Sequence, residues 1–255
     1  MFPAMGARLK FFALYLGYWL AFFFATRLVF LVFHEALAAR LAPLALAGTF
    51  GHGLRLDLAA AAYLSLIPFV VMALSVVGPP TRWLARLLLG YTVITTTALS
   101  LLAAADLETF RSWGRRIDAS VLIYLAFPRE IWAAAGGGNP WLLVAVFAVL
   151  TLGFSQLAWR LLKPRLLALP PVHGAAVVPL LFAAALLVIP GRGGIQQIPV
   201  NQSSAYFSTE PFANKAALNV GWNFFDSWVR GLNRRDNPFV VMPTDSAVAL
   251  VGGGL

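Results

Sequence analysis

The sequence predicts an all-α, polytopic membrane protein with about five transmembrane helices and further amphipathic helices at the membrane surface. Of its 255 residues, 60% are hydrophobic and only 11% are charged, whereas soluble domains average about 45–50% and about 25%. The apolar residues gather in stretches of about 20, the length of helix that crosses a hydrocarbon core about 30 Å thick. The excess apolar surface is therefore expected to face lipid.

The first predicted span covers residues 11–33 and contains one charged residue, Arg27. Because Arg27 lies near one end, its long side chain is expected to reach the membrane interface, and a buried functional arginine is the alternative. Arg8 and Lys10 precede the apolar run as in a secretory signal. The run exceeds the usual ~7–15 residues of such signals, so the segment is expected to be retained.

Four further apolar stretches complete a predicted transmembrane domain over residues 1–190. They cover residues 58–81, 87–105, 139–159 and 170–191. The longer connections between spans are two predicted extracytoplasmic loops, 34–56 and 106–138. A polar tail, 191–255, follows as a predicted extracytoplasmic linker.

Five spans place the termini on opposite sides of the membrane, and the basic residues favour a cytoplasmic N-terminus. With that orientation the short cytoplasmic segments contain no acidic residue and carry Arg8, Lys10, Arg82, Arg86, Arg160, Lys163 and Arg165. The basic residues of the opposite side are spread over much longer loops. Since short cytoplasmic loops are enriched in Lys and Arg, the sequence predicts a multi-pass membrane protein with a cytoplasmic N-terminus and an extracytoplasmic C-terminus.

Two segments outside the spans have apolar residues at helical spacing. In the loop 106–138 the pattern predicts an amphipathic helix in the headgroup plane, through Leu107, Phe110, Ile117, Val121 and Tyr124. In the tail it predicts a helix at about 210–232, with Thr209 as its cap and Pro211 in its first turn. The apolar face of this second helix consists of Leu218, Trp222, Phe225, Val229 and Leu232.

The densest charge cluster follows the third predicted span. It consists of Asp106, Glu108, Arg111, Arg115, Arg116 and Asp118. One interpretation is a lipid headgroup site, because paired arginines suit phosphate recognition. The other, which the spacing favours, is a set of ion pairs three residues apart, such as Glu108–Arg111 and Arg115–Asp118.

Several classes of function lack their usual residues. Net charge is +9 and cysteine is absent, but the basic residues flank spans, which indicates anionic lipid rather than nucleic acid as their partner. No HExxH, GxSxG or glycine-rich phosphate loop occurs, so no catalytic residue is predicted. His34, Glu35, His52 and Asp57 are a weak alternative as a metal site, because their spacing matches no common ligand pattern.

Three segments resemble the N-terminal membrane region of the lipoteichoic acid synthase-like, sulfatase-type phosphotransferases of bacteria. They are GLRLDLAAAAYL at 53–64, DLETFRSWGRRIDASVLIYLAFPRE at 106–130 and NQSSAYFSTEPFANKAALNVGWNFFDS at 201–227. The resemblance implies a location in the bacterial cytoplasmic (inner) membrane. It also implies five membrane helices and a linker, followed by an extracellular domain of the alkaline phosphatase superfamily. That domain uses a threonine nucleophile and a divalent metal, usually manganese, to transfer phosphoglycerol or related groups from lipid donors.

The sequence stops where that catalytic domain would begin, so neither its nucleophile nor its metal ligands can be assigned to any residue here. The chain is accordingly expected to be inactive alone and to act as a membrane anchor and linker that can present a lipid-linked donor. Its expected partners are membrane lipids and a sulfatase-type domain encoded downstream or separately. The alternatives are a small multi-pass transporter or channel component, and a membrane assembly protein.

Overall fold

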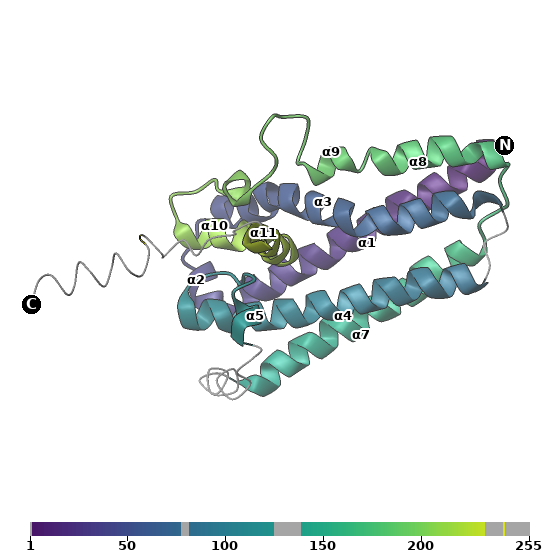
Figure 1. The fold of residues 1–255 in the computed structure, drawn as a ribbon. Coiled ribbons are helices and arrows are strands. Elements are labelled where there is room, and N and C mark those ends of the chain that lie inside the picture. Colours follow the sequence, from purple (N-terminus) through teal and green to yellow (C-terminus); the bar gives the residue numbers. More distant parts are fainter. Residues whose placement is uncertain (1, 78–81, 125–138, 233–241, 243–255) are drawn as a thin grey trace, which may run out of the picture.

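The computed structural model describes residues 2–77, 82–124, 139–232 and 242 (Figure 1). The part of the predicted loop 106–138 after Tyr124, and most of the tail after Leu232, lie outside these residues. The longer helices are α1 (Phe2–Phe33), α3 (Pro43–Leu74), α4 (Arg82–Trp113), α7 (Pro140–Leu167), α8 (Val177–Ala185) and α11 (Val220–Leu232). The described residues form no strand, and the predicted all-α class is confirmed.

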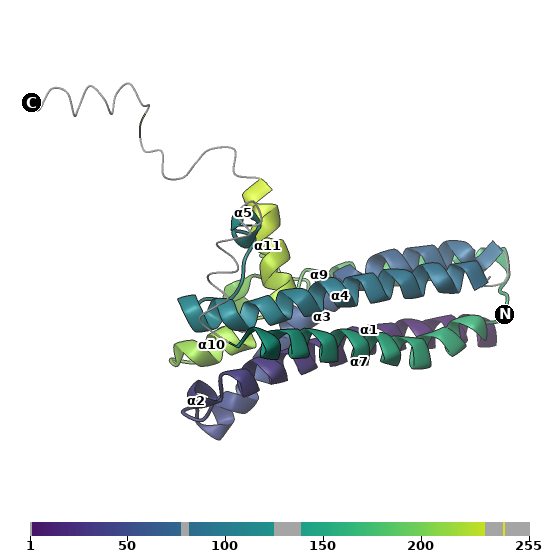
Figure 2. The same cartoon turned by 90° about the horizontal axis from the view of Figure 1, so that it is seen from below.

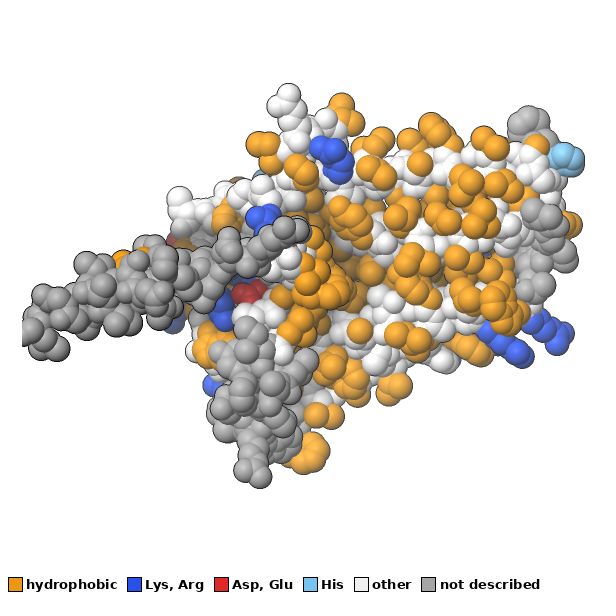
Figure 3. Space-filling model, viewed as in Figure 1, with side chains coloured by type: hydrophobic (Ala, Val, Ile, Leu, Met, Phe, Trp, Pro, Cys, Tyr) orange, Lys and Arg blue, Asp and Glu red, His pale blue; other side chains and the backbone are white. Residues whose placement is uncertain are grey.

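Five helical segments are long and apolar enough to cross a membrane, as predicted. The fifth runs from Gly174 to Gly191 and joins α8 to the short helix α9 (Val188–Gly191). The five lie side by side, with the N-terminus at one end and α10 and α11 at the other (Figures 1 and 2). We call these the N-terminal end and the tail end. Apolar side chains cover the flank between them (Figure 3).

Three spans are longer than a bilayer requires. The helices α1, α3 and α4 have 32 residues each, or about 48 Å at 1.5 Å per residue, against a core of about 30 Å. The second half of the predicted loop 34–56 is helical, since α3 begins at Pro43. A proline in the first turn suits a helix start. The charged residues Arg55 and Asp57, which interrupt the apolar pattern, lie within the helix.

The core is built around aromatic side chains of α1. Trp19, Phe22 and Phe23 are fully or almost fully buried. The Tyr15 and Tyr18 hydroxyls form hydrogen bonds of 2.9 and 2.7 Å with Thr92 and Thr96 of α4, respectively. Such hydrogen bonds add specificity to helix packing in a membrane, because an apolar helix face can pack against lipid tails as readily as against another helix.

The amphipathic helix predicted across 107–124 is not continuous. Helix α4 extends to Trp113, Gly114 turns the chain with a φ of +64°, and only the short α5 (Val121–Tyr124) follows. Glycine adopts this left-handed conformation at little steric cost, whereas other residues rarely do. The turn directs the chain back, so that the Ile117 amide donates to the Asp106 carboxylate at 2.7 Å.

The helix predicted at about 210–232 is two helices, α10 (Pro211–Ala217) and α11. Pro211 opens α10 as predicted, but the preceding residue, Glu210, occupies the cap position in place of Thr209. Leu218 has extended backbone angles, and the Asn219 side chain accepts from the Trp222 amide at 2.8 Å. Asparagine is a strong helix cap, which explains why a second helix starts here.

Candidate functional site

A buried ion pair joins two of the spans at the tail end. The Arg27 guanidinium of α1 donates to both carboxylate oxygens of Asp57 on α3, at 2.6 and 2.8 Å. Both side chains are at most 4% exposed. The prediction that Arg27 reaches the interface is therefore wrong, because an opposite charge on the neighbouring helix holds it inside the bundle.

A second buried ion pair lies where α4 ends. The Arg116 Nε atom is 2.7 Å from a carboxylate oxygen of Asp106, and both side chains are at most 5% exposed. The guanidinium carbon also lies 4.1 Å from the centroid of the Phe30 ring, a cation–π arrangement. Burial lowers the pKa of Arg116, while the Asp106 carboxylate acts in the opposite direction.

Both arginines bind the C-terminal end of α10. Arg116 donates to the Lys215 carbonyl at 2.8 Å, and Arg27 donates to the Ala216 and Ala217 carbonyls at 3.2 and 3.3 Å. Carbonyls in the last turn of a helix lack partners within it, and the helix dipole favours cations there. We call Arg27, Asp57, Asp106 and Arg116 the arginine clamp.

Asparagine side chains continue the clamp into α11. Asn219 donates to Asp57 at 2.8 Å, and Asn223 donates to the Ile117 carbonyl at 2.7 Å. Ser227 accepts from the Ala119 amide at 2.8 Å. The tail helices are thus fixed to α1, α3 and the turn after α4 by directed polar contacts as well as by apolar packing.

The predicted headgroup cluster is divided by the structure into three separate pairs. Glu108 pairs with Arg111, Arg115 pairs with Asp118 at 3.3 Å, and Asp106 pairs with the buried Arg116. Arg115 is half exposed, whereas Arg116 is enclosed. Arg115 and Arg116 therefore do not lie together as donors to one phosphate. Lipid binding by the exposed pairs stays a prediction.

The weak metal-site candidates do not converge on one point. Asp57 binds Arg27 and Asn219, and the His52 ring stacks on Phe207 with centroids 4.5 Å apart. His34 lies within an aromatic cluster. Among the described residues no three His, Asp or Glu side chains gather as ligands would. The manganese that the resemblance implies for a catalytic domain therefore does not fit these residues.

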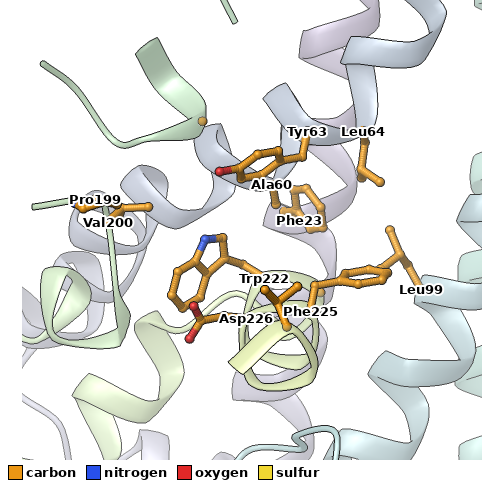
Figure 4. Close-up of a pocket in the computed structure, with 13 residues that line it drawn as sticks. Phe23, Ala60, Tyr63, Leu64, Leu99, Pro199, Val200, Trp222, Phe225 and Asp226 are labelled. Carbon is orange, nitrogen blue, oxygen red and sulfur yellow. The ribbon is translucent and has the colours of Figure 1, made fainter. Parts of the chain in front are cut away.

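An apolar cavity of about 470 Å³ lies between α11 and the spans. Trp222, Phe225 and Asp226 of α11 face Phe23 and Tyr63 across it (Figure 4). A volume of this order holds a small apolar ligand or part of an acyl chain. Its other walls come from membrane spans and from Pro199 and Val200 of the segment that follows the fifth span, so a lipid chain is the apolar ligand within reach.

Sequence patterns missed the most constrained residues of this site. The apolar stripe of the tail helix correctly includes Trp222 and Phe225, but Asp57, Asn219 and Asn223 carry no recognised motif. The available signal was the presence of Arg27 within one predicted span and of Asp57 directly before the next, since charges at membrane depth are usually paired. Their partnership depends on how α1 packs on α3, which spacing alone does not reveal.

The stability of the folded chain should depend on pH through protonation of His34. This side chain is 8% exposed and lies among Phe30, Phe33 and Phe110. Burial, followed by the charges of Arg116 and Arg111, lowers its pKa from 6.5 to about 4. The unfolded chain then binds more protons between these values, so stability is fully present above pH 6.5 and falls as the pH drops towards 4.

Thermal unfolding in detergent between pH 7 and 4.5 tests this. His34→Phe should lose stability less steeply than the wild type over that range. Identical pH profiles for both proteins would contradict a neutral, buried imidazole.

Comparisons of the chain with protein-family models, with curated proteins and with solved structures found no match. The resemblance to the lipoteichoic acid synthase-like enzymes therefore stays a prediction from the sequence segments.

Proposed function

We propose that this chain is the membrane-anchor and linker module of a lipoteichoic acid synthase-like, sulfatase-type phosphotransferase. The observation that carries the proposal is the arginine clamp, which holds α10 and α11 against the bundle. A linker fixed in this way sets the position and orientation of whatever domain it joins. An unattached tail would leave such a domain free to move along and away from the membrane.

The proposed enzyme transfers phosphoglycerol or a related group from a lipid donor, and the cavity beneath α11 supports that role. Its apolar walls suit an acyl chain, and α11 places Asp226 and Arg230, which pair at 2.8 Å, beside it. A lipid held here would have its headgroup near the tail. In this proposal the catalytic groups and the manganese come from a domain encoded downstream or separately.

Co-expression with a sulfatase-type domain encoded next to this chain tests the proposal. The domain should co-purify with the chain and show manganese-dependent cleavage of a chromogenic phosphodiester, whereas the purified chain alone should show background rates. Asp57→Ala should reduce co-purification, while Asp118→Ala, in an exposed pair, should not. Turnover by the isolated chain that disappears when one of its own residues is replaced would contradict the anchor role.

A transporter is the second candidate, because Arg27 and Asp57 are charges inside membrane spans and such residues often mark a pathway. In this chain both side chains are engaged, by each other and by the tail. A transport pathway would require this pair to separate during the cycle. The anchor proposal requires that it stays closed.

For topology we propose a bacterial inner-membrane location with the N-terminal end in the cytoplasm. This end holds the start of α4 and the end of α7 (Figure 1), and with them the exposed Arg82, Arg86 and Arg160. Enrichment of Lys and Arg in short connections favours the cytoplasmic side.

Single cysteines in this cysteine-free chain test the orientation. Ser112→Cys and Ser208→Cys, at the tail end, should react with an impermeant maleimide added to intact spheroplasts. Arg160→Cys, at the N-terminal end, should react only after lysis. The opposite pattern would reverse the proposed topology.

A further inference from the structure

A second cavity, of about 670 Å³, opens at the N-terminal end between α4 and α7, far from the arginine clamp. It has a basic part and an apolar part. The basic part consists of Arg82, Arg86 and Lys163. The apolar part consists of Ala85, Leu89, Gly90, Val93, Trp159 and Leu167.

The three cations of this cavity lack acidic partners within the described part of the chain, where every ion pair involves other residues. Lys163 instead has its Nζ atom 3.8 Å from the centroid of the Trp159 ring. Arg82 and Arg86 are one helical turn apart on α4, so they point to the same side. Three uncompensated cations around one opening create a site for an anion.

The apolar part continues along the same face of α4. Leu89, Gly90 and Val93 follow Arg86 by one and two helical turns, towards the centre of the span. A Cβ atom added at Gly90 would meet nothing within 4 Å, so the groove is open at this point. The cavity therefore combines cations at a bundle end with an apolar channel that runs to membrane depth.

We propose that this cavity binds an anionic phospholipid, with its phosphate among Arg82, Arg86 and Lys163 and one acyl chain along the groove at Gly90. Arginines bind phosphate oxygens through strong charge-assisted hydrogen bonds, and basic pockets between spans suit anionic headgroups. The position at the N-terminal end places this lipid in the leaflet opposite to the docked tail. The inference does not depend on the proposed enzymatic partner.

Lipid titration monitored by native mass spectrometry tests the site in the full chain. The variant Arg82→Gln/Arg86→Gln/Lys163→Gln should bind phosphatidylglycerol at least about tenfold more weakly than the wild type, since three charge-assisted contacts are lost. Phosphatidylcholine binding should change little. The matched control is Lys10→Gln/Arg160→Gln/Arg165→Gln, which removes the same charge from the same end without altering the cavity lining.

The control should lose less than about threefold in phosphatidylglycerol affinity, the effect of a weaker surface potential. Equal losses in the two triple variants would overturn the proposal and indicate nonspecific attraction. Both variants are compared as folded, monodisperse protein, with the thermal unfolding temperature as the check.

A second variant, Gly90→Leu, keeps all three cations and fills the groove. It should reduce phosphatidylglycerol binding by at least about fivefold without loss of stability, because glycine is unfavourable within a helix. Unchanged lipid binding by Gly90→Leu would overturn the acyl-chain assignment. So would inorganic phosphate at millimolar concentration, or an acidic peptide, competing equally with phosphatidylglycerol, because the cavity would then select a free anion or a protein segment.

Discussion

Replacing Asp57 with alanine is expected to destabilise the folded chain by about 3–5 kcal/mol, the cost of removing one partner from a buried ion pair. Arg27 would keep its charge inside the bundle, and Asn219 would lose an acceptor. The pair Asp226–Arg230, in which Arg230 is exposed and Asp226 is partly exposed, provides a control. Asp226→Ala should cost only about 0.3–0.5 kcal/mol, as is usual for surface pairs one helical turn apart.

The measurement combines thermal unfolding in detergent with a local probe of the tail. Ala213 of α10 is fully buried, and a cysteine placed there reports whether α10 leaves the bundle. In the Asp57→Ala background its reaction with maleimide should accelerate strongly. Unfolding and labelling equal to those of the Asp226→Ala control would contradict the role assigned to the pair.

The double variant Arg27→Leu/Asp57→Leu separates charge burial from tail binding. It removes the uncompensated charge, so global stability should recover in part. The Ala216 and Ala217 carbonyls would still lack their donor. Labelling at position 213 should therefore remain faster than in the wild type.

The second large loss of stability is expected from a substitution at Gly53, where α3 passes close to the arginine clamp. An added Cβ would lie 2.5 Å from Nη2 of Arg27 and 2.6 Å from the Ala217 carbonyl oxygen. Gly53→Ala should therefore push α3 away from α10 and destabilise the chain by about 1–3 kcal/mol, the usual cost of overpacking.

The matched control is Gly51→Ala on the same helix, where an added Cβ meets nothing within 4 Å. This change should be neutral or stabilise the chain by up to about 1 kcal/mol, because alanine favours a helix interior over glycine. Thermal unfolding of both variants in one detergent measures the difference. A loss of stability in Gly51→Ala as large as in Gly53→Ala would indicate a general helix effect in place of a contact with the clamp.

The spans were predictable because long apolar runs report directly on lipid exposure, and the helix start at Pro211 was predictable because proline suits the first turn of a helix. Helix ends were less predictable, since Arg55 and Asp57 suggested a loop where α3 continues. A charged residue lowers the local hydropathy but does not end a helix. Asp57 can lie inside the bundle because Arg27 of another helix pairs with it, and the sequence of α3 alone does not reveal that partner.

The charged cluster after α4 illustrates the same limit. The pairs Glu108–Arg111 and Arg115–Asp118 were predictable because both partners lie three residues apart. The pair Asp106–Arg116 needs the turn at Gly114. Its bond to the Lys215 carbonyl joins residues 99 positions apart, a contact that follows only from the tertiary fold.

The two cavities give the chain a different surface at each end. At the tail end the arginines pair with acids and helix carbonyls inside the protein, which leaves an apolar cavity beneath α11. At the N-terminal end the cations line an open cavity.

The central claim is that the tail helices are fixed to the bundle by the clamp. Hydrogen–deuterium exchange of the full chain in lipid nanodiscs tests it most directly. Backbone amides of α10 and the first turn of α11 should exchange at least about a hundredfold more slowly than those of the exposed segment 195–198, because they open only when the clamp breaks. Exchange in α10 as fast as in that loop would show that the tail is not docked, and would contradict the account.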